Sequence, residues 1–304
     1  MDAVKSTFSI KDLENLSGVK AHTIRIWEKR YSLFNPSRTP TNIRFYTLRD
    51  LQKILNVTYL LDRGFKISKI AGLSDAEIAQ NVAERVVQNE SQKHYQLINS
   101  FKIAMMNFDQ QLFAETYKQA MDHMEFDEVF YEVFIPLLEE IGLLWQAHTI
   151  DPSHEHFIAN LITQKILLNI EIHQRQFRPS KKEKFVLFLP ENEMHDLGLL
   201  FLNYVIVREG YAGIYLGQSI KLENLKYLRH HDEAVNFVTY LTVKPDTISV
   251  AEYVDRFNKE LDAFDFPLYL LGRKAGDASL EKLAPNAHIT PSIPEFINQL
   301  SQRG

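Results

Sequence analysis

The 304-residue chain contains no cysteine, which excludes disulfides, thiolate metal sites and cysteine nucleophiles together. No uninterrupted apolar run reaches the roughly eighteen residues of a membrane-spanning helix, so no such helix is predicted. The first residues, MDAVKSTFSIKDL, also lack the basic and then apolar pattern of a secretory signal peptide. We therefore expect a cytoplasmic protein. Because 45% of the residues are apolar and 12% are aromatic, we also expect well-formed hydrophobic cores.

Motifs of enzyme chemistry are missing as well. The chain has no Walker loop, no Gly-x-Gly-x-x-Gly loop and no paired nucleophile and base. We therefore expect no catalytic residues and a protein that is not an enzyme.

Positive charge is concentrated at the start of the chain. Residues 1–78 contain 13 Lys and Arg against 8 Asp and Glu, whereas the remaining residues contain 21 against 31. A basic first quarter on an acidic body predicts a local surface for a polyanion.

The basic segment has the order of a helix-turn-helix. Residues 9–17 predict a capped first helix, Gly18 a turn, and residues 21–31 a second helix. Ile24 and Trp27 can pack inward from the second helix. The alternative is a solvated basic helix in some other small domain. The side chains that the second helix could present to DNA are Thr23, Arg25, Lys29 and Arg30.

Residues 35–46 place turn residues between two basic, β-tolerant patches, as a β-wing does, and a further helix follows. The stretch TIRIWEKRYSLFNPSRTPTNIRFYTLRDL resembles the winged helix-turn-helix of the MerR family of transcription regulators, which we assign to residues 1–76. The resemblance implies a dimer on a two-fold related double-stranded DNA operator, with Arg25 in the major groove. It also implies phosphate contacts from the wing residues Arg38, Arg44 and Tyr46.

Residues 77–178 predict a four-helix bundle, because apolar residues recur there at spacings of three and four. Within it, nine residues separate Trp145 from Glu155 and His156 across a helix junction marked by Pro152. One interpretation is a buried tryptophan beside an acidic residue that interacts favourably with the positive end of the helix dipole. Another is a zinc site, although positions 154 and 156 point about 200° apart on a helix. The zinc ligands would be His148, His154 and His156.

Residues 179–304 predict a Rossmann-like, flavodoxin-like α/β domain with a parallel sheet. Its expected strands are KFVLFL, AGIYLG, AVNFVTYL, FPLYLLG and NAHIT, which alternate with helical or polar segments. Ligands of such sheets bind beyond the carboxyl ends of the strands, and His195 follows the first strand. Glu193 is placed to accept the other ring N–H of this histidine, as a metal-binding imidazole requires. Gly198 would let a planar ligand approach the backbone.

These motifs resemble those of base-off, His-on cobalamin domains. Residues 193–198, EMHDLG, are similar to Asp-x-His-x-x-Gly with Glu for Asp, and the resemblance implies His195 as the lower axial ligand of cobalt. Residues 239–241, TYL, are similar to Ser-x-Leu, and residues 271–273, LGR, contain half of a Gly-Gly motif. The cofactor-binding residues implied here are Glu193, His195, Gly198, Thr239, Leu241 and Gly272.

The tryptophan motif resembles that of helical bundles that precede cobalamin domains in light-sensing MerR-type regulators. The resemblance implies that Trp145, Glu155 and His156 pack over the upper face of the cobalamin. Two positions depart from the family: Arg273 places a cation where the family keeps no side chain, and Gln146 stands where the photoreceptors often have histidine.

Together the motifs imply a repressor whose operator binding is controlled by cobalamin bound between bundle and α/β domain, as adenosylcobalamin or methylcobalamin, with light as a further input. A dimer is expected from the head, and a tetramer through the bundle is an open alternative. A second hypothesis keeps the regulator with a degenerate cobalamin domain that senses another ligand or a protein partner. A third makes the chain a cobalamin-dependent methyl carrier.

Overall fold

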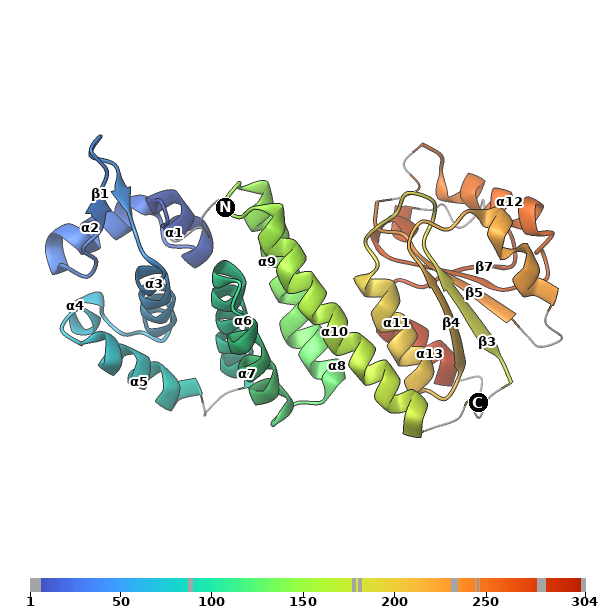
Figure 1. Ribbon diagram of the computed structural model, residues 1–304, viewed down its shortest axis with the longest axis horizontal. Coiled ribbons are helices and arrows are strands. Elements are labelled where there is room, and N and C mark those ends of the chain that lie inside the picture. The colour runs from blue at the N-terminus through green and yellow to red at the C-terminus, as the bar shows by residue number, and fades with distance from the viewer. Residues whose placement is uncertain are drawn as a thin grey trace. The chain divides into compact units, whose positions relative to one another are not determined.

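A computed structural model describes residues 7–86, 90–176, 179, 182–230, 235–243, 245, 247–277 and 283–301. Its contacts divide the chain into two units, residues 1–162 and 163–304, each of which is described by itself (Figure 1). The boundary predicted after residue 178 lies outside the described residues, and the one predicted after residue 76 falls within a helix. No helix in the described part of the chain is both long and apolar enough to cross a membrane.

The first unit begins with the predicted winged helix-turn-helix head. Two of its helices, α1 and α3, start at capping boxes, in which Ser9 pairs with Asp12 and Thr47 pairs with Asp50. Gly18 ends the first helix at φ +74°, a left-handed conformation that glycine adopts without strain. The elements of the head are α1 (Ile10–Ser17), α2 (Ala21–Tyr31), β1 (Ser37–Arg38), β2 (Arg44–Phe45), α3 (Leu48–Leu61), α4 (Ile67–Ile70) and α5 (Asp75–Val86).

The bundle follows, and its core is aromatic. The ring of Phe101 lies 4.9 Å from that of Phe113 and 5.5 Å from that of Phe134. One helix contains a π-helical turn just before Pro136, which has no N–H, and there Ile135 donates its N–H to the carbonyl of Phe130. The elements are α6 (Glu90–Asn107), α7 (Gln110–Met121), α8 (Phe126–Val129), η1 (Phe130–Phe134), α9 (Ile135–Gln146) and α10 (Pro152–Gln176), which reaches into the second unit.

The second unit contains a sheet of five parallel strands, and all five predicted strands are present. The strand order is β4-β3-β5-β6-β7. The chain adds β4 on one side of β3 and all later strands on the other side, which is the arrangement of flavodoxin-like folds. The strands are β3 (Lys184–Phe188), β4 (Ala212–Gly217), β5 (Val235–Tyr240), β6 (Leu268–Leu271) and β7 (Ala287–Ile289).

Helices cover both faces of this sheet, as Figure 1 shows for α11 and α13 on one side and α12 on the other. The alternation of strand side chains explains the two layers. Phe188 stacks on Phe257 of α12, with ring centroids 6.2 Å apart, whereas Phe185 packs against Phe296 of α13. The helical elements are α11 (Leu197–Arg208), η2 (Leu222–His230), α12 (Val250–Leu261), η3 (Arg273–Asp277) and α13 (Ile293–Ser301).

Candidate DNA-binding and cofactor-binding sites

Helix α2 presents a basic outer face. Ile24 and Trp27 are buried against the rest of the head, as the sequence predicts. The structure adds Ile26, half of whose side chain is exposed, and sequence reasoning did not identify it. Because residues 24 and 27 face inward, residue 26 must face outward, where its methyl groups could contact a thymine methyl. Of the predicted DNA contacts on this helix, Arg25, Lys29 and Arg30 are exposed and Thr23 is half-buried.

The wing is tied to α2 through one carboxylate. Glu28 accepts a hydrogen bond from Nε of Arg44 at 3.0 Å, and a second one from the hydroxyl of Tyr46. Tyr46 is completely buried, and its pKa is raised by burial and by the neighbouring Glu28. The predicted phosphate contact of Tyr46 is therefore corrected: this residue holds the wing against the recognition helix.

The tip of the wing is a short hairpin. Arg38 donates from Nη1 to the side-chain oxygen of Asn42 at 2.7 Å, and Asn42 has a φ of +62° at the turn. Arg38 is exposed, so its guanidinium remains accessible to a phosphate while the hairpin orients it.

The second unit presents His195 just beyond the carboxyl end of β3. Nδ1 of His195 lies 2.6 Å from Oε1 of Glu193, and 62% of the histidine side chain is exposed. Because Nδ1 is engaged, Nε2 is the ring nitrogen that is left for a ligand. A histidine oriented by a carboxylate through its other nitrogen is the arrangement typical of metal-binding imidazoles.

Glu193 itself is buried, with only 1% of its side chain exposed. Its Oε1 also accepts the backbone N–H groups of Met194 and His195, each at 3.0 Å, and its Oε2 accepts the N–H of Val243 at 2.8 Å. These backbone N–H groups, together with the ring of His195, compensate the burial of this carboxylate. They also fix the loop after β3 to the loop after β5.

Gly198 has a different role from the one predicted. A Cβ atom at this position would lie 2.9 Å from Cζ of Tyr240, whose ring occupies the space above the glycine. Burial raises the pKa of the Tyr240 hydroxyl. The missing side chain of Gly198 therefore admits Tyr240, and the predicted approach of a planar ligand to the Gly198 backbone is corrected to this packing contact.

The other two motifs adjoin the first at the same edge of the sheet. Thr239 and Leu241 are fully buried, so a direct cofactor contact by either side chain stays a prediction that requires the core to open. Gly272 has a φ of +91°, and a Cβ there would lie 2.6 Å from the carbonyl oxygen of Leu241. Arg273 is exposed at the start of η3, so its guanidinium is not packed into the core.

In the first unit, Trp145 lies at the end of α9 with 49% of its side chain exposed, so the alternative of a buried tryptophan is wrong. Glu155 is half-buried and His156 exposed in the first turns of α10. His154, by contrast, is buried, its Nδ1 accepts the N–H of Asp151, and its ring packs on Phe108. The described residues contain no group of three or more side chains that could hold a metal ion, so the zinc alternative has no support.

The loop between α9 and α10 also contacts the head. Nδ2 of Asn15, in α1, donates to Oγ1 of Thr149 at 2.7 Å, and Thr149 is fully buried. The two residues are 134 positions apart in sequence, so no local pattern could have indicated this contact. It joins the first helix of the DNA-binding head to the loop that follows Trp145.

Two family models match segments of the chain. Residues 8–77 match the MerR HTH family of regulatory proteins, and residues 97–168 match a B12 binding domain. The chain is 26% identical to the HTH-type transcriptional repressor CarH of Myxococcus xanthus, over 84% of this chain and 82% of that protein. It is 22% identical to the repressor CarA of the same organism, over 69% and 68% of the two chains.

A solved structure shares the fold of about two thirds of the chain. The monomethylamine corrinoid protein of Methanosarcina barkeri aligns with a TM-score of 0.52 and 15% identity, over 69% of this chain and 99% of that protein. At this identity the likeness shows the fold alone.

Proposed function

Because this chain is a MerR-family regulator with a B12-binding domain, we propose that it is a repressor whose hold on its operator is set by bound cobalamin. Its response to cobalamin and its binding to DNA follow from this membership and from its repressor relatives. The observation that carries the finer proposal is the exposed imidazole of His195, oriented by the buried carboxylate of Glu193.

The residues around His195 fit a cobalamin. The cofactor supplies a cobalt ion whose lower axial position a neutral imidazole nitrogen can fill. Glu193 holds Nδ1, so it fixes the ring orientation and leaves Nε2 outward. Arg273 is exposed and does not fill the core, which removes one objection to binding of the nucleotide tail.

We assign the upper contacts to the tryptophan motif of the first unit. Trp145 offers an exposed aromatic face, and Glu155 and His156 offer polar groups from the start of α10. An exposed indole can stack on a planar ligand, which is compatible with a binding role. Gln146 is exposed beside Trp145 and has no ring nitrogen for cobalt, so the light chemistry of a second histidine is not assigned to this position.

We propose that the state of the cofactor reaches the head through the loop after Trp145. Thr149 in this loop accepts the hydrogen bond from Asn15 of α1, so movement of the loop would alter how the head is held. Two heads that engage a two-fold related operator together bind far more tightly than one, so a change in head position can release DNA. A dimer is the smallest assembly with this property, and a tetramer through the bundle remains the open alternative.

The direct test mixes purified protein with adenosylcobalamin in the dark and then separates bound from free cofactor by gel filtration. We expect the protein fraction to retain the absorption of cobalamin, and His195→Ala to lose it or to shift its spectrum. Operator binding is then compared with and without cofactor, before and after illumination. A colourless wild-type protein would overturn the cofactor proposal and leave DNA binding intact.

The second hypothesis, a regulator that senses another ligand or a protein partner, draws on the burial of Thr239 and Leu241. It predicts that His195→Ala leaves regulation unchanged. The methyl-carrier hypothesis draws only on the likeness to a corrinoid protein, and we propose that the chain is not an enzyme because the curated relatives are regulators.

A further inference from the structure

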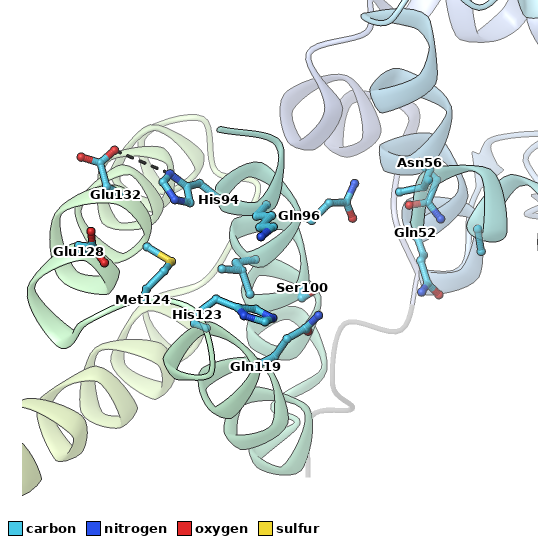
Figure 2. Close-up of a pocket in the computed structure, with 15 residues that line it drawn as sticks. Gln52, Asn56, His94, Gln96, Ser100, Gln119, His123, Met124, Glu128 and Glu132 are labelled. Carbon is cyan, nitrogen blue, oxygen red and sulfur yellow. Dashed lines mark ion pairs between the residues drawn. The ribbon is translucent and has the colours of Figure 1, made fainter. Parts of the chain in front are cut away.

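A polar pocket of about 580 Å³ lies within the first unit, between the head and the bundle (Figure 2). One wall comes from α3 and α5 of the head. The other comes from α6, α7, the turn that follows α7, α8 and η1. Its volume is that of a site for a small organic ligand. None of the DNA-binding or cofactor-binding residues assigned above lines it.

Carboxamides lie on both walls of the pocket. Gln52 and Asn56 extend from α3, and Gln96 and Gln119 extend from the bundle across the pocket (Figure 2). Each carboxamide presents a donor and an acceptor side by side, so it can form two parallel hydrogen bonds with a matching edge of a ligand. Four such groups around one pocket favour a ligand with several adjacent donors and acceptors.

One of these groups lacks a partner. The amide nitrogen of Gln96 is buried and makes no hydrogen bond with any described residue. A buried donor that is left unpaired costs free energy, and an acceptor atom on a ligand would recover it. Gln96 is therefore the residue on which ligand affinity should depend most strongly.

The ionisable side chains that line the pocket include acidic and basic groups, and His123 is one of them. His94 lies 3.8 Å from Glu132, and Glu128 accepts the backbone N–H of Glu125 as part of a helix cap. Lys93 also lines the pocket and offsets part of the acidic charge. This balance favours an uncharged ligand over an anion or a cation.

Apolar side chains supply the remaining surface. Val82 of α5 and Leu97 of α6 line the pocket and are buried, with Ala120 and Met124 nearby in the same lining. A flat ring can pack on such a surface while its edge reaches the carboxamides.

We propose that this pocket binds a neutral heterocyclic ligand of nucleoside type, whose base edge pairs with the carboxamides and whose ring lies on the apolar surface. Asn and Gln recognise adenine by two parallel hydrogen bonds, which is the pairing this arrangement offers. A ligand here touches α3 of the head and α6 of the bundle, so it acts on DNA binding as a second input, independent of cobalamin.

The test titrates adenosine, and separately uridine and maltose, into the full-length protein by isothermal calorimetry. Maltose is neutral and rich in hydroxyls but has no planar ring. We expect adenosine to bind, and Gln96→Leu to weaken its binding by about tenfold or more. The matched control is Gln111→Leu, which removes a carboxamide from an exposed position of α7 outside the pocket.

Each outcome decides the proposal. It is overturned if neither nucleoside binds, if maltose binds as tightly as adenosine, or if Gln96→Leu and Gln111→Leu behave alike. If Gln96→Leu does not fold, Gln119→Leu on the same wall takes its place with the same expectation. Cobalamin retention by these variants should equal that of the wild type, which separates this site from the proposed cofactor site.

Discussion

The carboxylate of Glu193 holds the imidazole of His195 by a 2.6 Å contact to Nδ1, while three backbone N–H groups hold the carboxylate itself. We predict that Glu193→Gln weakens cobalamin binding by about 10- to 100-fold, since loss of the partner of a metal-binding histidine has that effect. Replacing an anion by an amide also places the NH2 group of glutamine against N–H donors. The measurement is cofactor affinity by absorption titration.

The matched control for this change is Glu191→Gln, two residues earlier in the same loop. Glu191 is exposed, and its contact is a 3.8 Å ion pair with Lys221, so its loss should leave cofactor affinity unchanged within about twofold. Equal affinities for Glu193→Gln and wild type would contradict the role given to the buried carboxylate.

Removal of Glu28 should weaken DNA binding although it removes a negative charge from a DNA-binding surface. Charge alone predicts tighter binding for Glu28→Ala. Loss of this carboxylate, however, frees Arg44 and leaves the buried hydroxyl of Tyr46 without its acceptor, at a cost of about 1–3 kcal/mol. We expect the loss of order in the wing to outweigh the removed negative charge, so the variant should bind DNA more weakly. Operator affinity measured at several salt concentrations checks the direction of this change.

The control for that experiment is Glu14→Gln, which makes a similar change of charge elsewhere in the head. Glu14 pairs with Lys11 and Lys20 near the end of α1, and its side chain does not contact the wing. This variant should bind DNA at least as tightly as the wild type. A Glu28→Ala protein that also binds more tightly would show that electrostatics outweighs the order of the wing.

The parts that the sequence predicts well are those set by neighbouring residues. The orientation of His195 by Glu193 involves residues two positions apart, so the spacing alone indicated it. The capped helices and the five strands likewise follow from local patterns of polar and apolar residues.

The parts that were missed or misassigned depend on packing between distant segments. The ring of Tyr240 fills the space above Gly198, although the two residues are 42 positions apart. A glycine in the sequence indicates free space, but it does not indicate whether a ligand or an aromatic side chain fills that space. The resemblance to the MerR family implies a phosphate contact for Tyr46, whereas the fold turns this residue inward onto Glu28. Neither contact has a periodic signal in the sequence.

The hydrogen bond between Asn15 and Thr149 predicts that operator binding can be made less responsive to cobalamin by a change outside the cofactor site. Thr149→Val keeps the shape of the side chain and removes the acceptor, at a cost of about 0.5–1.5 kcal/mol. If the loop transmits the state of the cofactor, the ratio of operator affinities with and without cobalamin should fall by up to about tenfold. Asn15→Ala should have the same effect, and a ratio that is unchanged in both variants would exclude this route.

Asp75 should contribute a pH-dependent part of the stability of the head. Ion pairs with Lys53 and Arg49, each with a 2.9 Å contact, lower the pKa of its carboxyl and connect α3 to α5. Because the folded pKa lies below the unfolded value of about 3.9, this stabilisation is present above that pH and is lost as the pH falls through the folded pKa. Asp75 and Arg49 are partly exposed, so we expect less than about 1 kcal/mol.

The measurement compares the thermal unfolding midpoints of wild type and Asp75→Asn between pH 7 and pH 3. The difference should be largest at neutral pH and should shrink towards pH 3. The control is Asp265→Asn, an exposed change in a turn of the second unit, which should leave the unfolding midpoint at neutral pH nearly unchanged. A difference for Asp75→Asn that grows in acid would contradict the assignment.

Two glycines provide opposite expectations for the same substitution. At Gly198 a Cβ would lie 2.9 Å from the ring of Tyr240, so Gly198→Ala must displace an aromatic side chain, at a cost of about 1–3 kcal/mol. At Gly142, within α9, nothing lies within 4 Å of the added atom, so Gly142→Ala should stabilise the protein by about 0.5–1 kcal/mol. Chemical denaturation of both variants checks these signs.

The double variant Gly198→Ala with Tyr240→Leu should recover part of the loss, because the shorter side chain leaves room for the methyl group. If Gly198→Ala proved as stable as the wild type, the space above Gly198 would be free for a ligand after all.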